Sequence, residues 1–523
     1  MTSDGYDAVV IGAGVSGLTT AAYLARGGAR VLVLEQAEQV GGLLNSFTRD
    51  GYHFDGGVKA LENSGLMMPI LAQLGVLDQI EFQRSRSALI IDGRVDPVGG
   101  WADVVALFHH LGDLFPEDVP GLRHVLRDAQ AVFELLDGAF SLPIPLFGLP
   151  GGTGEYTAWL RQNGKTLLRS SRALLLTRTD MRSYLCRHLR SAALIDLLCT
   201  LFPDGTGAFF GLAYFHLFAD YYYPRGGMQV IPSALAEAVR RHGGEIRLSA
   251  KVGRVLLRDG QASGVVLSDR EEVPARYVVA AADMRQTFTS LLPPGLLPAQ
   301  LERDVRQAGV SHSVFQVFLG LDMPPDALGL QGCQHVFYFP LLGGVESLER
   351  ETDIDYYARA PQEISVPALY ESGLAPPGKT GLNISVMTTW RSLGGWEEDP
   401  LKYEEQKQAC ARELIANLEK YVPGLSERVE LCLTASPVTI ASRTSNAEGA
   451  IMGWSWERER ALRRGRFLQV RSSVRTPVPR LLVAGQWAMT PAGVPTAALT
   501  GFLAADEVLG RSRKEAGGAA VSA

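Results

Sequence analysis

The sequence predicts an α/β fold that opens with a Rossmann-type βαβ unit. Three observations between residues 6 and 35 lead to this prediction: an apolar run of strand length, a glycine turn with the spacing GxGxxG, and a helical stretch followed by a second apolar run that ends in an acid. A lone GxGxxG also occurs in ordinary turns, but here all of these parts fall in register. The pattern therefore indicates a turn that binds a dinucleotide.

The first strand is expected over Ala8–Ile11 and the helix over Ser16–Arg26, with Gly12, Gly14 and Gly17 forming the motif between and within them. A side chain in the turn would keep the backbone away from a pyrophosphate, and one at Gly17 would hold the helix off the strand. The phosphates would meet free N–H groups at the positive end of the helix dipole.

The second strand is expected over Arg30–Glu35. A carboxylate at Glu35 can accept hydrogen bonds from both ribose hydroxyls of a bound adenosine, and it would repel a 2′-phosphate. The acid therefore disfavours NADP and leaves FAD or NAD as the cofactor.

The stretch after Glu35 favours FAD. It contains the pair Gly41–Gly42, a predicted hairpin around Asp50–Gly51, and the run Phe54–Gly57. A simple nicotinamide-binding domain would continue with another helix and strand, whereas glycine pairs let the backbone lie flat against a longer cofactor.

With these residues the chain resembles the phytoene desaturase-like branch of the FAD-dependent amine oxidase superfamily, which includes carotenoid desaturases, carotenoid isomerases and retinol saturases. Three later segments carry the same resemblance: Tyr221–Leu257, Tyr277–Asp283 and Arg480–Leu509. The resemblance implies that FAD is the cofactor. It also implies that the Val252 backbone faces the adenine, that Gly485 meets the phosphates, and that the turn and helix at residues 493–497 lie under the flavin ring.

The motifs and the resemblance together give a set of expected cofactor-binding residues, and no metal site is expected. The set is Gly12, Ala13, Gly14, Val15, Ser16, Gly17, Glu35, Gln36, Gly41, Gly42, Leu43, Gly57, Val58, Val252, Ala282, Gly485, Gly493, Val494 and Pro495.

The positions of these segments predict the domain organisation. A Rossmann-type FAD-binding domain would be assembled from residues 1–85, 220–290 and 475–510, and a mixed α+β substrate domain from residues 86–219 and 291–474. Residues 511–523 are polar and rich in small side chains, so a frayed tail is expected there.

Composition narrows the function classes. The net charge of −6 gives no basic field that would attract nucleic acid. The five cysteines are scattered without a CxxC pair, which is typical of free thiols in a reducing compartment. Residues 1–5 have no basic or apolar character, which argues against a signal peptide. The expected location is the cytoplasm or, for a protein that binds the membrane peripherally, the inner face of the membrane.

Two apolar stretches, residues 131–150 and 205–224, bear on the substrate. Prolines interrupt the first, the second carries eight aromatics, and neither is a long uninterrupted apolar span, so a transmembrane helix is not expected. Both stretches fit a buried core. They also fit an apolar tunnel for the substrate or a surface that inserts into a bilayer. The resemblance favours this second interpretation because polyenes reside in membranes.

The resemblance implies hydride transfer at flavin N5 that desaturates, saturates or isomerises C–C double bonds of a polyene or isoprenoid lipid. The sequence has no second GxGxxG for a nicotinamide domain. Electrons are therefore expected to enter or leave the flavin through the substrate and a diffusible acceptor such as oxygen or a quinone.

Four residues are candidates for catalysis. Lys59 and Glu62 follow the glycine pair expected near the flavin, where either could bridge to N5 or act as a base; the alternative is a solvated pair with each other. Tyr223 and Arg225 lie just before a Gly-Gly turn. His216 is expected to be a hydrogen-bonded core histidine.

Two departures from bacterial phytoene desaturases argue against phytoene itself as the substrate. Thr490–Thr496 replaces the pattern H-P-G-A-G-[IV]-P-G, and Asp55–Lys59 replaces D-x-G-P. Trp390 and Trp487 are candidates for the cavity wall. Two other functions stay open: an amine oxidase acting on a polar amine, which needs a carboxylate or an aromatic cage, and a flavoprotein that acts as a non-redox isomerase.

Overall fold

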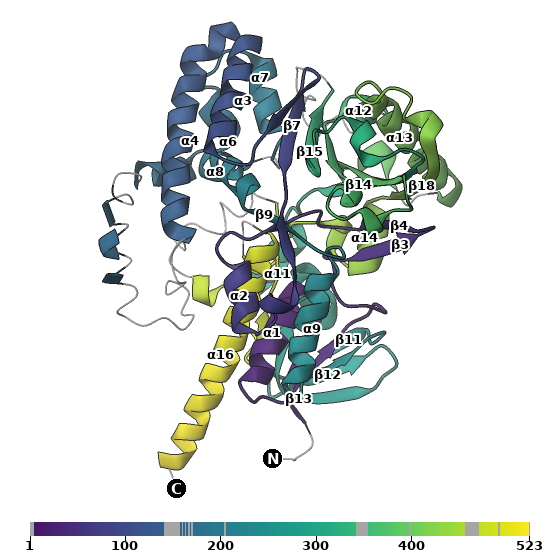
Figure 1. The fold of residues 1–523 in the computed structure, drawn as a ribbon. Helices are drawn as coiled ribbons and strands as arrows, with labels where there is room; N and C mark the ends of the chain where they lie inside the picture. Colours follow the sequence, from purple (N-terminus) through teal and green to yellow (C-terminus); the bar gives the residue numbers. More distant parts are fainter. Residues whose placement is uncertain are drawn as a thin grey trace.

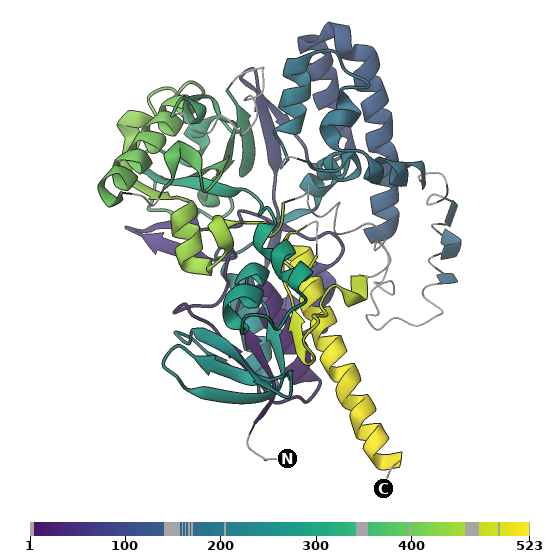
Figure 2. The same ribbon diagram turned by 180° about the vertical axis from the view of Figure 1, so that it is seen from behind.

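The protein has two halves that meet at its middle (Figures 1 and 2). In the view of Figure 1, the lower half contains α1, α9 and α16, and the upper half places a group of helices beside a second sheet. The computed structural model describes residues 5–140, 157–158, 160–162, 164–165, 168, 171–202, 205–340, 354–396, 399–455, 470–489 and 492–521.

The first sheet is built from three distant parts of the chain. Its parallel core has the order β10-β2-β1-β13-β19. The strands are β1 (Tyr6–Ile11), β2 (Val31–Leu34), β10 (Glu245–Arg247), β13 (Glu272–Ala280) and β19 (Leu481–Val483). The antiparallel strands β11 (Val252–Arg258) and β12 (Gln261–Leu267) extend the sheet from β13. The predicted Rossmann-type assembly from three segments is therefore confirmed.

Helix α1 (Val15–Arg26) forms because small and apolar residues fill most of its positions and all but its last residue are buried. It packs against α9 (Val230–Arg241) and α16 (Val494–Val521), and Figure 1 shows the three side by side. The strand–helix–strand order predicted for residues 8–35 is confirmed within one or two residues at each end. Helix α16 continues through residues 511–521, where the sequence predicts a frayed tail.

The second sheet has the order β18-β14-β17-β16-β15-β7-β8. One of its faces is apolar: Val317, Ile364 and Ile384 pack with Leu414 of α13 in one buried cluster. Residues of the opposite face line a cavity that is described below. The strands are β7 (Ser87–Ile91), β8 (Arg94–Pro97), β14 (Ser313–Leu321), β15 (His335–Phe339), β16 (Gln362–Ser365), β17 (Thr380–Thr388) and β18 (Val429–Ala435).

A group of helices stands beside this sheet (Figure 1). It consists of α3 (Trp101–Leu114), α4 (Val119–Phe140), α6 (Met181–Leu185), α7 (Ala192–Cys199) and α8 (Ala208–Leu217). These helices share one apolar cluster, to which α8 contributes the buried side chains of Phe215 and Leu212. The first apolar stretch of the sequence forms the end of α4 as far as Phe140, and its residues 141–150 lie outside the described residues.

The predicted hairpin at Asp50–Gly51 is confirmed by β3 (Ser46–Arg49) and β4 (Tyr52–Asp55). Both turn residues have positive φ, which matches the twist that tight hairpins need. A three-stranded sheet of β5 (Leu61–Glu62), β9 (Tyr221–Pro224) and β6 (Phe82–Arg84) lies between the two halves. Further α-helices among the described residues are α2 (Met67–Gln73), α10 (Met284–Gln286), α11 (Ala299–Gln307), α12 (Asp355–Arg359), α13 (Pro400–Glu419) and α14 (Pro437–Thr444).

Within the described ranges, no helix combines the length and the apolar character that crossing a bilayer requires.

Candidate active site

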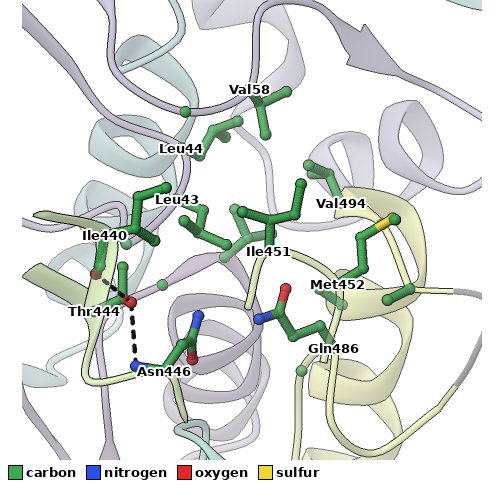
Figure 3. A pocket seen from close by; sticks show the side chains of 18 of the residues that line it. Leu43, Leu44, Val58, Ile440, Thr444, Asn446, Ile451, Met452, Gln486 and Val494 are labelled. Carbon is green, nitrogen blue, oxygen red and sulfur yellow. Dashed lines mark hydrogen bonds between the residues drawn. The ribbon is translucent and has the colours of Figure 1, made fainter. Parts of the chain in front are cut away.

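A cavity of about 490 Å³ runs from the glycine turn before α1 to the second sheet. Figure 3 shows part of its wall, where apolar side chains from separate segments, among them Leu43, Ile451 and Val494, surround a common space together with the amide of Gln486. The cavity therefore joins the half that contains the first sheet to the half that contains the second sheet.

The glycine turn leaves room at the start of α1. A Cβ built on Gly14, which precedes the helix, would have no heavy atom within 4 Å, and Gly14 lines the cavity. A Cβ on Gly17 would instead meet the carbonyl oxygen of Gly12 at 1.9 Å, so Gly17 is required for the helix to pack on the strand. Open space at a helix N-terminus fits the pyrophosphate of a dinucleotide.

Glu35 lies at the end of β2 with its carboxylate held in place. Its Oε2 accepts a hydrogen bond from the Ala13 N–H at 2.7 Å, and its Oε1 accepts one from the Ala37 N–H at 2.9 Å. Each carboxylate oxygen can accept a further hydrogen bond. Because Glu35 also lines the cavity, the residues present fit an adenosine ribose at this end.

The structure brings most of the expected cofactor residues together around this cavity. The exceptions are Ala13, whose N–H binds Glu35, Gly17, which lies behind the turn, and Pro495, which is buried in the first turn of α16. Sequence reasoning missed several further lining residues. Gln486 adjoins the expected Gly485 and could have been found by that adjacency, but no motif marks the others: Leu44, Gln286, Asn446, Ile451 and Met452.

Lys59 is buried in the cavity wall. Its Nζ donates to the carbonyl oxygen of Gly57 at 2.6 Å and to the amide oxygen of Gln316 at 2.5 Å, with the Gln316 amide oriented so that its nitrogen donates to the Gly56 carbonyl oxygen. Burial lowers the pKa of Lys59, while the carboxylates of Glu363 and Asp55 oppose that shift. These contacts replace the solvated pair with Glu62 that was the alternative interpretation.

Glu62 lies in β5 and lines the same cavity. Burial raises the pKa of its carboxyl group to about 7; a hydrogen bond from Ser64 opposes the shift and the nearby Asp220 carboxylate adds to it. Glu62 therefore holds a proton at a pH where an exposed glutamate is ionised.

Tyr223 and Arg225 do not line the cavity. The Tyr223 hydroxyl donates to Asp55 Oδ2 at 2.7 Å, and its buried ring stacks on Tyr370 at 3.9 Å between centroids. Arg225 is exposed at the end of β9, where it pairs with Glu81 and Glu371. The structure thus separates this half of the predicted catalytic set from Lys59 and Glu62.

His216 is buried on α8, and its Nε2 lies 2.7 Å from Asp137 Oδ1. The prediction of a hydrogen-bonded core histidine is confirmed.

The second sheet contributes polar groups that sequence reasoning missed. Gln316, Ser385 and Glu363 are cross-strand neighbours on β14, β17 and β16, and all three line the cavity. His335 of β15 also lines it, with Nε2 at 2.8 Å from Glu363 Oε1. Burial alone would raise the pKa of Glu363, but the His335 hydrogen bond and the Lys59 charge hold that pKa below its ordinary value.

Six phenylalanine and tyrosine side chains line the cavity. They are Phe202, Phe210, Tyr214, Tyr221, Phe337 and Phe339. Three of them come from the aromatic stretch at residues 205–224, while Phe215 and Phe218 of the same stretch are buried in the core. The stretch therefore contains both kinds of residue: three of its aromatic side chains line the cavity, and Phe215 and Phe218 belong to the buried core. Trp487 lines the cavity as expected, and Trp390 is not among the lining residues.

In the described part of the chain, no group of three or more His, Cys, Asp or Glu side chains is arranged to hold a metal ion.

Comparison with known proteins places these features in a family. A family model described as "Flavin containing amine oxidoreductase" matches residues 15–509. The chain is 27% identical over 551 residues to a zebrafish (Danio rerio) protein named "Inactive all-trans-retinol 13,14-reductase", covering 97% of this chain and 86% of the relative. It is 27% identical over 453 residues to the chloroplastic prolycopene isomerase of carrot (Daucus carota), covering 83% and 69%.

Among solved structures, an oxidoreductase from Methanosarcina mazei has a similar fold. It superposes with a TM-score of 0.60 at 17% identity, covering 95% of this chain and 98% of the other.

Proposed function

This chain belongs to the flavin-containing amine oxidoreductase family, and from that premise we propose that it transfers hydride between FAD and a hydrophobic polyene or isoprenoid lipid. The protein is an FAD-dependent oxidoreductase, and the predicted cofactor is confirmed. In the proposed reaction, C–C double bonds of the lipid are formed, reduced or isomerised. The names of its relatives support this substrate class: one is a prolycopene isomerase, one an inactive all-trans-retinol 13,14-reductase, and another zebrafish relative, 25% identical, an all-trans-retinol 13,14-reductase.

FAD supplies a site that accepts or returns a hydride. The chain's own residues would hold it in an extended form: the N-terminus of α1 with Gly14 at the pyrophosphate, and Glu35 at the ribose. Leu43 and Val494 would contact the ring system at the junction with the second half.

One observation carries the substrate proposal: the cavity that includes the glycine turn is also lined by six phenylalanine and tyrosine side chains, five from the second half and one, Tyr221, from β9 between the halves. Apolar and aromatic walls bind ligands mainly by burying their apolar surface. A flexible polyene can lie along such a wall with one double bond near the cofactor.

Lys59 and Glu62 are the proposed polar groups beside the reacting atoms. Lys59 presents a buried amino group whose pKa is lowered by burial, and Glu62 a carboxyl group that can release or take up a proton near neutral pH. Tyr223 is proposed only to position β4 through its hydrogen bond to Asp55.

An amine substrate is the competing proposal, and one observation favours it: Glu62 and Glu363 both line the cavity beside aromatic rings. Three features weigh against it. The raised pKa of Glu62, about 7, weakens this carboxyl group as a counter-ion, Glu363 already accepts a hydrogen bond from His335, and the Lys59 Nζ is a hydrogen-bond donor, which does not complement an ammonium group. We therefore rank the polyene first.

Anaerobic mixing tests the proposal. The FAD-loaded protein, with its flavin oxidised in one series and reduced in another, is mixed separately with a carotenoid, a retinoid and a primary amine. A polyene that changes the flavin absorbance supports net redox chemistry, and polyene product without a lasting absorbance change supports isomerisation. Absorbance changes with the amine alone would overturn the polyene proposal.

Electron exchange with oxygen or a quinone belongs to the same proposal. Reoxidation of the substrate-reduced flavin by each acceptor, followed in rapid mixing, tests it.

Peripheral membrane contact also belongs to the proposal. Leu174 and Leu175, adjacent in the 3-10 helix Ser171–Arg178, have exposed fractions of 48% and 61%, and exposed leucines side by side favour an apolar partner. In sedimentation with lipid vesicles, the double variant Leu174→Glu/Leu175→Glu should bind several-fold less than wild type. The control Leu401→Glu, at a leucine 80% exposed on α13, should bind normally. Equal sedimentation of all three proteins would contradict the membrane proposal.

A further inference from the structure

The cavity-facing side of the second sheet is unusually polar for a buried surface. In register across three strands lie Gln316, Ser385 and Glu363, and the amide oxygen of Gln316 accepts from Ser385 Oγ at 3.2 Å. The opposite face of the same strands is apolar. Buried polar groups are costly unless they are hydrogen-bonded, so their gathering on one face beside a cavity points to a role there.

We infer that Glu363 is the group that exchanges a proton with the substrate, and that His335 positions it. This inference rests on the proposed function, since it requires a substrate carbon in the cavity that loses or gains a proton.

The geometry around Glu363 leaves one carboxylate oxygen for this task. His335 Nε2 lies 2.8 Å from Oε1, and because an ionised carboxylate only accepts hydrogen bonds, His335 must donate from Nε2. His335 is itself fixed, with an exposed fraction of 3%, between its cross-strand neighbours Ser87 and Ser365. Oε1 is thereby held, and Oε2 remains to face a reacting C–H group.

The other charged or titratable groups that act on Glu363 come from three further elements. Lys59 lies in the segment before β5, Tyr214 on α8 and Tyr221 on β9. Lys59 stabilises the ionised carboxylate, as the His335 hydrogen bond does. Lys59 is a poorer proton acceptor because its Nζ donates to two carbonyl-type oxygens. Glu62 carries its proton to higher pH and suits the acid role.

The proton transfer balances as follows in the desaturating direction. Glu363 Oε2 takes H⁺ from one substrate carbon, and the electron pair of that C–H bond becomes the second pair of the new C=C bond. The hydride that leaves the adjoining carbon is accepted by oxidised FAD. In the saturating direction, protonated Glu363 returns H⁺ to carbon and the hydride comes from reduced FAD.

The variant Glu363→Gln tests the inference. Glutamine can still accept the His335 hydrogen bond but cannot take a proton, so turnover of a polyene should fall by about 100-fold or more while the flavin spectrum and the unfolding midpoint stay near wild type. In the saturating direction, with reduced FAD in D₂O, wild type should place deuterium on a substrate-derived carbon and the variant should not. Glu271→Gln, at an exposed carboxylate paired with Arg247, is the matched control and should behave as wild type.

The positioning role of His335 needs a different readout. His335→Leu removes the donor, so the pKa of Glu363 should rise and the acid limb of the desaturation pH profile should move to higher pH. The kcat should fall with little change in KM, and His335→Gln, which keeps a donor, should restore part of the rate.

The outcomes separate the two proposals. A wild type that transforms a polyene together with a Glu363→Gln variant that is equally fast, or that exchanges deuterium equally, overturns the inference alone. A wild type that leaves every polyene unchanged overturns the proposed function and the inference with it.

Discussion

Gly14 and Gly17 belong to one motif but have separable roles. A Cβ on Gly14 would extend into open space in the cavity, whereas a Cβ on Gly17 would collide with backbone. Gly14→Ala should leave the unfolding free energy of the cofactor-free protein within about 1 kcal/mol of wild type but weaken FAD binding at least tenfold. Gly17→Ala should cost about 1–3 kcal/mol or more even without FAD.

Thermal unfolding of the FAD-free variants and fluorescence titration with FAD test the two predictions for Gly14→Ala and Gly17→Ala. Equal FAD affinity in Gly14→Ala and wild type would show that the turn does not contact the cofactor.

Glu62 makes stability depend on pH in a defined direction. Its pKa is raised from 4.5 to about 7 in the folded protein, so between these values the folded state binds more protons than the unfolded state. The stability contributed by the protonated carboxyl group is therefore fully present below pH 4.5 and is lost as the pH rises from 4.5 to about 7. The total loss is on the order of 3 kcal/mol.

Glu62→Gln keeps the neutral form at every pH, so relative to wild type it should gain stability as pH rises from 5 to 8. Urea unfolding at several pH values measures the difference. A difference that is constant over this range would contradict the raised pKa.

At the residue scale, the sequence predicts well what a local motif specifies. Gly14 and Glu35 could be predicted because the motif and the acid are close in sequence and their spacing has a steric reason. Glu363 and His335 could not, because they meet only when β16 pairs with β15, and no spacing in the chain marks that pairing. Tyr223 was predicted from its neighbourhood in sequence, but its hydroxyl donates to Asp55 and its ring stacks on Tyr370, and it does not line the cavity.

Helix α8 contributes side chains both to the cavity wall and to the buried core of the helical group. Phe210 lines the cavity, while Phe215 is buried in the helical core. Phe215→Ala should cost about 3–5 kcal/mol of unfolding free energy, as for other buried aromatics. Phe210→Ala should cost clearly less and should instead raise the KM for a polyene.

Denaturant unfolding and polyene kinetics on the two variants separate these roles. A Phe210→Ala variant with unchanged KM would remove α8 from the proposed substrate wall.

At the element scale, the βαβ unit and the Asp50–Gly51 hairpin were predictable because periodicity and turn chemistry are local. The second sheet was not, because it combines strands from residues 87–97, 313–388 and 429–435, and only tertiary packing selects that order. Helix α16 runs to Val521, although small polar residues near its end favour an irregular tail on propensity alone.

The whole molecule depends on three chain segments that meet in one sheet around the cofactor site. Because FAD binds the folded state and would contact all three segments, added FAD should raise the unfolding midpoint in proportion to the logarithm of its free concentration. Differential scanning fluorimetry over a range of FAD concentrations measures this, with riboflavin as a control that lacks the pyrophosphate. An equal effect of riboflavin would contradict the role assigned to the N-terminus of α1.

The central claim is that one cavity presents a hydrophobic polyene to the flavin. The most direct test is product analysis by mass spectrometry and chromatography after the FAD-loaded protein is incubated anaerobically with a carotenoid, a retinoid and a primary amine in one mixture. We expect a polyene whose double bonds have changed in number or geometry, and an amine that is untouched. An oxidised amine beside unchanged polyenes would contradict the account.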